Sequence, residues 1–416
     1  MCKNRFHIHM HTLNGFIVPI FSCFLLLAFF LDACAAGKEP DSINVNFAQA
    51  NSSFNDEGIR FSCTPSRLRE ISAGMANYLA SLGITPNLIV KRADQVNDTL
   101  VFALNTPSND YDTLQLKSRR EFSIKDRFVR LPAKNGKFRR VATVSKKEIL
   151  LALLQHGRLT EFSGENCNLR ALKELVGLRQ NIVAWSENLN WVWPDGESAE
   201  WNEKYWHRGT PLREIQMHEA VVDAFMNQGK YSIGCYTATK LVIVQGVLDY
   251  YRRVSNDHLR QKQIETSLLS DQEPLVNIEP GAMWSFEQDF DPALARPGKL
   301  LRIQYGVAPR NFVPGDWVYL LNNDPVSSRK IGYEGSNAIY LGRNKFADYY
   351  NDNRHSYTYR QKLNEVFQWR NSVFNRRRDS AKIQFLSDEE FRQLGKSPVA
   401  GGLVMDFRVS PAHFIY

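Results

Sequence analysis

Residues 232–248 have the sequence SIGCYTATKLVIVQGVL. From Ala238 onward leucine, valine and isoleucine dominate, and this length and apolarity predict a helix that is buried on most sides. Cys235 stands where that helix is expected to begin, and the unpaired amides and dipole of a helix start favour an anion such as a thiolate. Gly234 leaves room for an acyl group to approach the sulfur. The pattern indicates a nucleophilic cysteine, with a small buried apolar residue as the alternative.

Periodicity on either side of this segment predicts an α+β fold, with helices preceding a sheet. Ser145 and Glu148 form a capping box before one expected helix, and Thr210 and Pro211 resemble the start of another. The expected helices cover residues 65–82, 149–156, 169–188 and 211–227. Strands are expected at residues 100–104, 114–116, 301–307, 317–321, 338–341 and 345–349.

Composition along the chain suggests four segments. A basic, glycine-containing stretch at residues 134–140 separates a small α+β N-terminal domain (41–136) from a thiol-containing domain (145–375). Residues 1–34 are expected to be a targeting segment, and residues 376–416 a C-terminal extension. No chemistry is visible in the N-terminal domain.

The N-terminal segment has the features of a bacterial signal peptide. Lys3 and Arg5 precede an uncharged run at residues 16–31, which is long enough for a signal sequence but short for a bilayer span. Leu31-Asp32-Ala33-Cys34 resembles a lipobox, so Cys34 is a candidate for lipidation and membrane attachment; cleavage after an A-x-A-like site is the competing interpretation. Both predict a location outside the cytoplasm, as an envelope lipoprotein or a secreted protein.

Charge and cysteine content limit the partners and cofactors. Lys and Arg exceed Asp and Glu by 52 to 44, and the excess gathers in runs such as Arg139-Arg140 and residues 376–378. Such a surface can attract anionic lipid or acidic polymer, or be simply solvated, and for an exported chain nucleic acid is not an expected partner. Cys63 and Cys167 could pair in an oxidising compartment, which leaves Cys235 as a free thiol. No C-x-x-C pair occurs, and neither a metal nor an organic cofactor is implied.

Five stretches from Leu172 to Asn364 occur in the order found in a known family. They are LRQNIVA (178–184), CYTAT (235–239), GDWVY (315–319), GSNAIYLG (335–342) and KLN (362–364). In these stretches the chain resembles the small bacterial protein-glutamine gamma-glutamyltransferases of the spore-coat type. That family's fold is related to the NlpC/P60 papain-like hydrolases, which implies a helix packed on an antiparallel sheet.

The resemblance implies a reaction and its partners. Cys235 would attack a protein or peptide glutamine carboxamide, release ammonia and hold a thioester. A lysine amine would then resolve the thioester to an isopeptide bond, and water in its place would give deamidation.

The acid and base positions depart from the family pattern. The family has glutamates where this chain has Gly234 and Ser336, and its histidine position aligns with Tyr349 or, with a shift of one residue, Asp348. Glu334 lies two residues from Ser336 and would face the same side of an extended segment, so it is a candidate replacement carboxylate. His355, on the following loop, is the candidate base, since an imidazole titrates near neutrality.

Two other functions remain open from the sequence. The segment PGDWVY (314–319) also resembles an NlpC/P60 strand motif, which suggests a cell-wall peptide amidase or endopeptidase. Loss of the acid and base residues would instead leave a non-catalytic binding protein of the same fold. A tryptophan-rich loop either anchors onto the core or lines a substrate groove; its members are Trp191, Trp193, Trp201 and Trp206.

Overall fold

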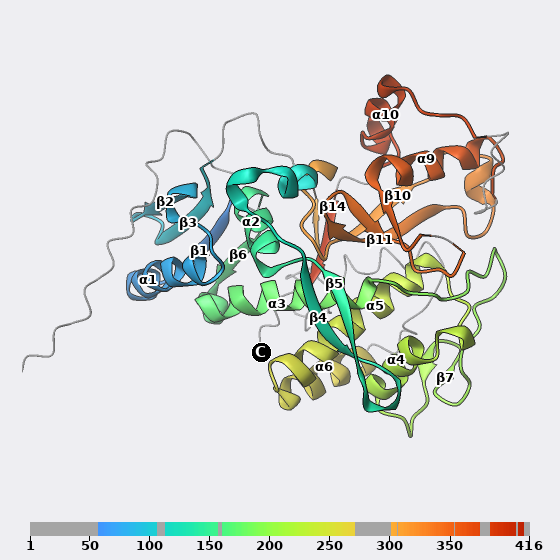
Figure 1. Cartoon of the computed structure of the whole chain (residues 1–416), viewed down its shortest axis with the longest axis horizontal. Coiled ribbons are helices and arrows are strands. Elements are labelled where there is room, and N and C mark those ends of the chain that lie inside the picture. Colours follow the sequence, from blue (N-terminus) through green and yellow to red (C-terminus); the bar gives the residue numbers. More distant parts are fainter. Residues whose placement is uncertain are drawn as a thin grey trace, which may run out of the picture. The chain divides into compact units, whose positions relative to one another are not determined.

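The computed structural model describes residues 57–105, 113–156, 160–270, 301–305, 307–352, 354–374, 383–404 and 407–411. The described residues fall within one compact unit, Val45–Tyr416. Helices and mainly antiparallel sheets both contribute to it, so the predicted α+β class is confirmed (Figure 1). The predicted targeting segment and Cys34 lie outside the described residues.

A four-stranded sheet forms the N-terminal part of this unit. Its order is β2-β3-β1-β6, antiparallel except for the parallel pair β1 and β6. The strands are β1 (Ile59–Ser62), β2 (Ile89–Asp94), β3 (Thr99–Leu104) and β6 (Thr160–Ser163). The helices that contact it are α1 (Pro65–Ser81), which fulfils the helix prediction there, and α2 (Lys146–His156).

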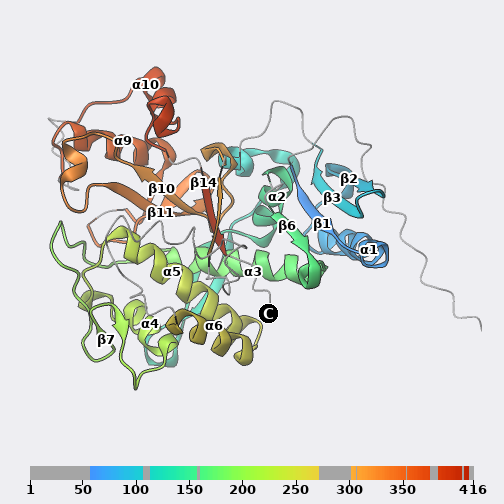
Figure 2. The ribbon, with the colours of Figure 1, turned by 180° about the vertical axis from the view of Figure 1, so that it is seen from behind.

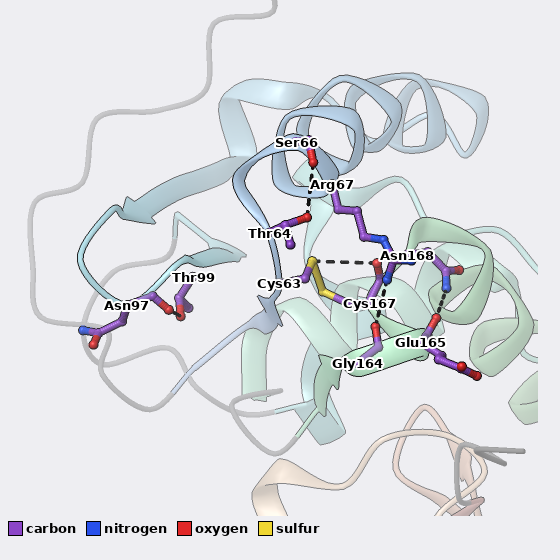
Figure 3. Close-up of a disulfide and its surroundings, with 10 residues drawn as sticks. All are labelled: Cys63, Thr64, Ser66, Arg67, Asn97, Thr99, Gly164, Glu165, Cys167 and Asn168. Atoms are coloured by element: carbon purple, nitrogen blue, oxygen red, sulfur yellow. Dashed lines mark hydrogen bonds between the residues drawn. A yellow bond between two sulfur atoms is a disulfide. The ribbon is translucent and has the colours of Figure 1, made fainter.

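A disulfide joins Cys63, just after β1, to Cys167, just before helix α3 (Leu169–Ser186) (Figure 3). The pairing inferred from the cysteine count is thereby confirmed. Both the disulfide and strand β6 connect residues from opposite sides of the predicted boundary at 136–145. The independence of an N-terminal domain stays a prediction. In this structure, β6 of the second segment completes the sheet of the first.

A two-stranded ribbon follows β3 along the chain and precedes α2. It consists of β4 (Arg127–Pro132) and β5 (Phe138–Thr143), paired antiparallel along their whole length. Both strands contact α3, and the ribbon runs across the front of that helix in Figure 1. Its turn contains the first part of the basic stretch that was expected to separate two domains, residues 134–137, and residues 138–140 of that stretch lie in β5.

Helices α3 and α5 (Cys235–Asp249) form the centre of the molecule, side by side in both Figure 1 and Figure 2. Nearly every residue of α5 after the first is buried, as its apolar sequence predicted. The two helices approach closely at Gly246, where an added Cβ would lie 2.5 Å from Ile182 Cγ1. A π-helical turn, Tyr250–Val254, follows α5 and leads to α6 (His258–Ser270).

The segment between α3 and α5 departs from the prediction in one place. A helix was expected from residue 211, but Thr210–Pro211 forms strand β8, paired with β7 (Trp206–His207). Helix α4 begins only at Met217 and spans Met217–Met226. The prediction was wrong because Leu212 N bonds to Tyr205 O, which closes a hairpin in place of a first helical turn.

The six-stranded sheet of the C-terminal half has the order β13-β12-β11-β10-β14-β9, and its paired strands are antiparallel. The strands are β9 (Leu301–Tyr305), β10 (Trp317–Leu321), β11 (Gly335–Gly342), β12 (Lys345–Ala347), β13 (Ser356–Thr358) and β14 (Phe407–Pro411). Strand β14 comes from the segment predicted as a C-terminal extension and pairs with β10 and β9. Helix α9 (Tyr359–Arg370) packs on this sheet, and α10 (Asp388–Leu394) packs on α9.

Side chains alternate between the two faces of this sheet, as the pleat requires. Trp317 and Ile339 belong to the core shared with α5, whereas Val318 and Tyr340 belong to a second core beneath α9. The sheet is therefore held between the cysteine-bearing helix and α9. Among the described residues, we find no helix long and apolar enough to cross a bilayer.

Candidate active site

Cys235 is the first residue of α5, with Gly234 as N-cap, as the sequence predicted. Its side chain is half-buried, and it is the free cysteine of the described residues. No side chain caps this helix, so its first amides and dipole are available to stabilise negative charge at the sulfur. The position suits a nucleophile that reacts as a thiolate.

Strand β11 supplies two further donors to the same sulfur. The backbone N–H of Asn337 lies 3.4 Å from Cys235 Sγ, and its side-chain Nδ2 lies 3.5 Å away. Asn337 Oδ1 accepts a hydrogen bond of 2.8 Å from the indole Nε1 of Trp317 on β10. Because an indole N–H can only donate, this bond directs the oxygen of the amide to Trp317 and its NH2 group to the sulfur.

Tyr349 occupies the position that aligns with the family histidine, and its side chain is fully buried. Its hydroxyl accepts from Ile339 N at 2.9 Å and lies 2.9 Å from Thr239 Oγ1, which itself donates to Cys235 O at 2.8 Å. Burial is the main cause that raises the pKa of this phenol far above its ordinary value, so it stays protonated. Tyr349 therefore braces the start of α5 through Thr239 and does not act as a base.

Two small pockets meet at the cysteine. Trp193, Tyr236, Tyr319 and Glu334 line the first together with Cys235. The second is lined by Cys235, Ser336, Asp348, Lys362 and Glu365, among others. The sulfur is thus accessible from an aromatic side and from a side that carries charged groups.

Glu334 and Asp348 are the two predicted site residues that the structure brings to these pockets. Glu334 precedes β11, and its Oε1 accepts from Gly332 N at 3.1 Å. Burial, followed by the charges of Cys235 and Glu334, raises the pKa of Tyr319, whose hydroxyl bonds to Glu334 O. Asp348 is 3 % exposed, and its backbone N–H donates to His355 O at 2.9 Å.

His355 is not brought to the cysteine. Its Nδ1 lies 2.9 Å from the carbonyl oxygen of Leu189, and the residue does not line either pocket beside Cys235. A carbonyl can only accept, so the proton of this ring sits on Nδ1. The backbone φ at His355 is 63°, in the left-handed region.

The tryptophans of the tryptophan-rich loop serve both roles considered for them: some anchor the loop onto the core, and one lines the pockets. Trp191 and Trp206 are buried, and their indole N–H groups bond to carbonyl oxygens of α4. Trp193 lines both pockets and contacts Tyr333 edge to face at 5.3 Å. Trp193 thus belongs to the site, while Trp191 and Trp206 anchor the loop.

Sequence reasoning missed Asn337 and Trp317 as parts of the site. Both lie within stretches that resemble the family, but only the pairing of β10 with β11 places them together beside the sulfur. Within the described residues, no group of three His, Cys, Asp or Glu side chains is arranged to hold a metal ion.

Buried polar contacts explain other members of the matched stretches. Arg179 on α3 forms an ion pair of 2.8 Å with Asp316, the residue before β10, and also bonds to Pro314 O. Asn181 Nδ2 donates to Gly246 O and to Asp249 Oδ2 on α5. These contacts fix the cysteine helix and the sheet relative to α3, which positions the site.

Comparison with known proteins adds three findings. Residues 134–365 match the model of a family described as protein-glutamine gamma-glutamyltransferase. A solved transglutaminase from Geobacillus stearothermophilus, without its C-terminal extension, is similar at 19 % identity and a TM-score of 0.35, covering 59 % of this chain and 94 % of that one. No curated protein matches the chain.

Proposed function

The chain belongs to the protein-glutamine gamma-glutamyltransferase family, and from this premise we propose that Cys235 is its nucleophile and Asp348 its proton acceptor. Its function is protein-glutamine gamma-glutamyltransferase-like, that of a cysteine-dependent acyltransferase acting on protein glutamine with an amine acceptor. The observation that carries the assignment of Cys235 is its position at the uncapped start of α5, with two N–H donors of Asn337 directed at its sulfur. Such donors stabilise the thiolate that attacks.

The reaction follows from this arrangement. The Cys235 thiol transfers its proton to the Asp348 carboxylate, and the thiolate attacks the carboxamide carbon of a glutamine side chain. The C–N bond breaks, the departing nitrogen takes up that proton, and ammonia leaves behind a thioester. A primary amine then attacks the thioester and loses a proton to Asp348, while the sulfur leaves as a thiolate. Water in place of the amine gives glutamate.

Asp348 is favoured over the other candidates by its position. It is buried in a pocket that also contains Cys235. Glu334 lies in the opposite pocket with its Oε1 committed to Gly332 N, and His355 lines neither pocket. Glu334 is therefore assigned to the aromatic side of the site.

The experiment combines two assays on one set of variants: ammonia release from a glutamine-containing protein such as casein, and incorporation of a fluorescent primary amine. Cys235→Ala should abolish both signals, a loss of more than about a thousandfold. Asp348→Asn should lower both by about a hundredfold, while Glu334→Gln and His355→Gln lower them less. Equal activity in wild type and Cys235→Ala would refute the assignment, as would a wild-type chain without either activity, which would favour a binding protein.

An envelope or secreted location is a further part of the proposal. The disulfide Cys63–Cys167 supports it, since disulfides are rare in the reducing cytoplasm. Attachment of Cys34 to the membrane would account for the lipobox-like sequence. Cell fractionation with wild type and Cys34→Ser, with the membranes washed in high salt to remove electrostatically bound protein, tests both points: lipidation predicts that only the wild type stays with the washed membranes, and cleavage predicts that neither does. Retention of both in the cytoplasm would contradict export.

A further inference from the structure

The ribbon β4–β5 has one buried face and one exposed face. Leu131 and Val141 are buried on the inner face. The register pairs Arg130 with Arg140, Pro132 with Phe138, and Phe128 with Ala142, so these six residues share the outer face. Phe128 is 51 % exposed and Phe138 54 % exposed, and both arginines are exposed as well. We call these six residues the outer ribbon face.

The ribbon is strongly cationic. Residues 127–143 contain six lysine and arginine residues and no aspartate or glutamate. Among the described residues, no carboxylate forms an ion pair with Arg130 or Arg140. Each instead lies over a phenylalanine ring of the same face, Arg140 at 3.7 Å from the centroid of Phe128 and Arg130 at 5.1 Å from that of Phe138. Charge and apolar surface therefore alternate over one continuous area.

We propose that the outer ribbon face binds the surface of an anionic phospholipid bilayer. Arginine side chains complement phosphate headgroups, and exposed aromatic rings enter the boundary between headgroups and acyl chains. A soluble polyanion satisfies the arginines but offers no apolar phase for the two phenylalanines. A single-stranded nucleic acid needs open ring faces for its bases, and here a guanidinium already covers one face of each ring.

The proposed surface is separate from the active site. Cys235 begins α5, whereas the ribbon turn shares a surface basin with Asp249 and Arg252, at the other end of that helix. A helix of this length spans about 20 Å. Membrane binding and transfer to a soluble substrate can therefore be measured independently, and the inference depends neither on the proposed function nor on Cys34.

The test is co-sedimentation of the full chain with vesicles of phosphatidylcholine alone and of phosphatidylcholine mixed with phosphatidylglycerol. We expect binding to the anionic vesicles that weakens with added salt. Arg130→Glu/Arg140→Glu should weaken this binding by at least about tenfold, since two attractive charges become repulsive. Phe128→Ser/Phe138→Ser, which keeps the charge, should also weaken it. All variants keep the same N-terminal residues, so that segment contributes equally to each.

The matched control is Arg69→Glu/Arg120→Glu, which makes the same change of charge at two exposed arginines outside the ribbon. It should bind the anionic vesicles nearly as well as the wild type. An equal loss in the control would show that net charge alone is responsible and would overturn the proposal. Full retention of binding by the phenylalanine variant would do the same, as would equal binding to neutral vesicles or tighter binding to a single-stranded oligonucleotide. Transfer activity on soluble casein should be unchanged in the ribbon variants and confirms that they are folded.

Discussion

The side-chain amide of Asn337 bonds to the Trp317 indole on one side and to the Cys235 sulfur on the other. Trp317 Nε1 donates to Asn337 Oδ1, while the Nδ2 and the backbone N–H of Asn337 point to Cys235 Sγ. A hydrogen bond to a charged group contributes about 1.5–3 kcal/mol, more than one between neutral groups. Asn337 therefore directs two donors at the negative charge that develops on the sulfur during the reaction, and Trp317 is the residue that positions it.

Asn337→Asp should lower kcat/KM for amine incorporation by about 10- to 100-fold, because the side-chain donor is replaced by a carboxylate. It should also move the pH profile of Cys235 alkylation by iodoacetamide to higher pH, since a negative charge then faces the thiolate. Trp317→Phe, which removes only the indole N–H, should shift the same profile in the same direction by a smaller amount.

Trp206→Phe is the control for that pair. It also removes a buried indole N–H, here bonded to Ala220 O, but at a distance from the cysteine pockets. Its alkylation profile should match the wild type even if its stability falls. Identical profiles for Asn337→Asp and wild type would show that Asn337 plays only a structural part.

Glu148 is a buried carboxyl group close to the turn between β11 and β12. An added Cβ at Gly342 would lie 2.6 Å from its Oε1. Burial raises its pKa from 4.5 to about 7, in spite of the opposing charge of Arg343. The folded state therefore holds this proton more tightly than the unfolded chain, and the free energy of unfolding must fall as pH rises from 4.5 to 7.

Glu148→Gln should remove this pH dependence. At pH 8 the variant should be more stable than the wild type by up to about 3 kcal/mol, because no buried charge remains, and at pH 4 the two should be nearly equal. Urea unfolding at both values of pH measures the difference. Glu70→Gln, at an exposed position on α1, should change stability little at either pH. Stabilisation of Glu148→Gln that is the same at pH 4 and pH 8 would contradict the argument.

Single residues of the site were predictable from the sequence to different degrees. Cys235 could be placed because an apolar helix immediately follows it. Asn337 could not, because its role depends on the register between two strands, which short apolar segments do not reveal. His355 was proposed from its distance along the chain, but its ring bonds to Leu189 O in the folded loop, which the sequence does not reveal.

Elements were predicted best where one apolar pattern runs for many residues. Helices α1, α3 and α5 begin close to their predicted starts, and β10 covers the predicted residues. Short patterns failed: residues 114–116, expected as a strand, lie in a 3-10 helix, Thr113–Ser118. Leu116 is buried there while its neighbours are not. Three residues are too few to distinguish the spacing of apolar residues in a helix from their alternation in a strand. Proline at 211 was a misleading helix start, since it suits a hairpin strand equally well.

The contact between α3 and α5 depends on the absence of a side chain at Gly246. In Gly246→Ala the new Cβ would lie 2.5 Å from Ile182 Cγ1 and 2.7 Å from its Cα, so the helices must separate. This overpacking should cost about 2 kcal/mol, more than the gain of up to 1 kcal/mol in helix propensity. Thermal unfolding should show a midpoint about 2–4 °C lower, since the net cost is about 1 kcal/mol.

Gly229→Ala is the matched control for this contact. No atom lies within 4 Å of a Cβ added at Gly229, in the short turn before α5. Its stability should remain within about 0.5 kcal/mol of the wild type. Wild-type stability in Gly246→Ala would mean that the two helices are not held at this distance.

At the scale of the molecule, the hydrophobic core does not follow the predicted boundary between two domains. One continuous cluster includes Phe61 on β1, Leu172 on α3 and Val242 on α5. Composition indicated a linker at residues 134–140, because basic and glycine residues gather there. Residues 134–137 form the turn of a ribbon instead, and residues 138–140 begin its second strand, since turns and linkers share that composition.

The disulfide Cys63–Cys167 closes a loop with a sequence separation of 104 residues around the first sheet, α1 and α2. Cross-linking a loop of this length should stabilise the folded state by about 2–5 kcal/mol, chiefly by restricting the unfolded chain. Cys63→Ser/Cys167→Ser should therefore unfold at a midpoint about 5–15 °C lower than the oxidised wild type. At 25 °C its transfer activity should persist, because neither cysteine lines the pockets beside Cys235. Reductant should lower the midpoint of the wild type and leave that of the double variant unchanged. A double variant as stable as the oxidised wild type would mean that the pairing of β1 with β6, at Ser62 and Ser163, holds the two segments together without the covalent bond.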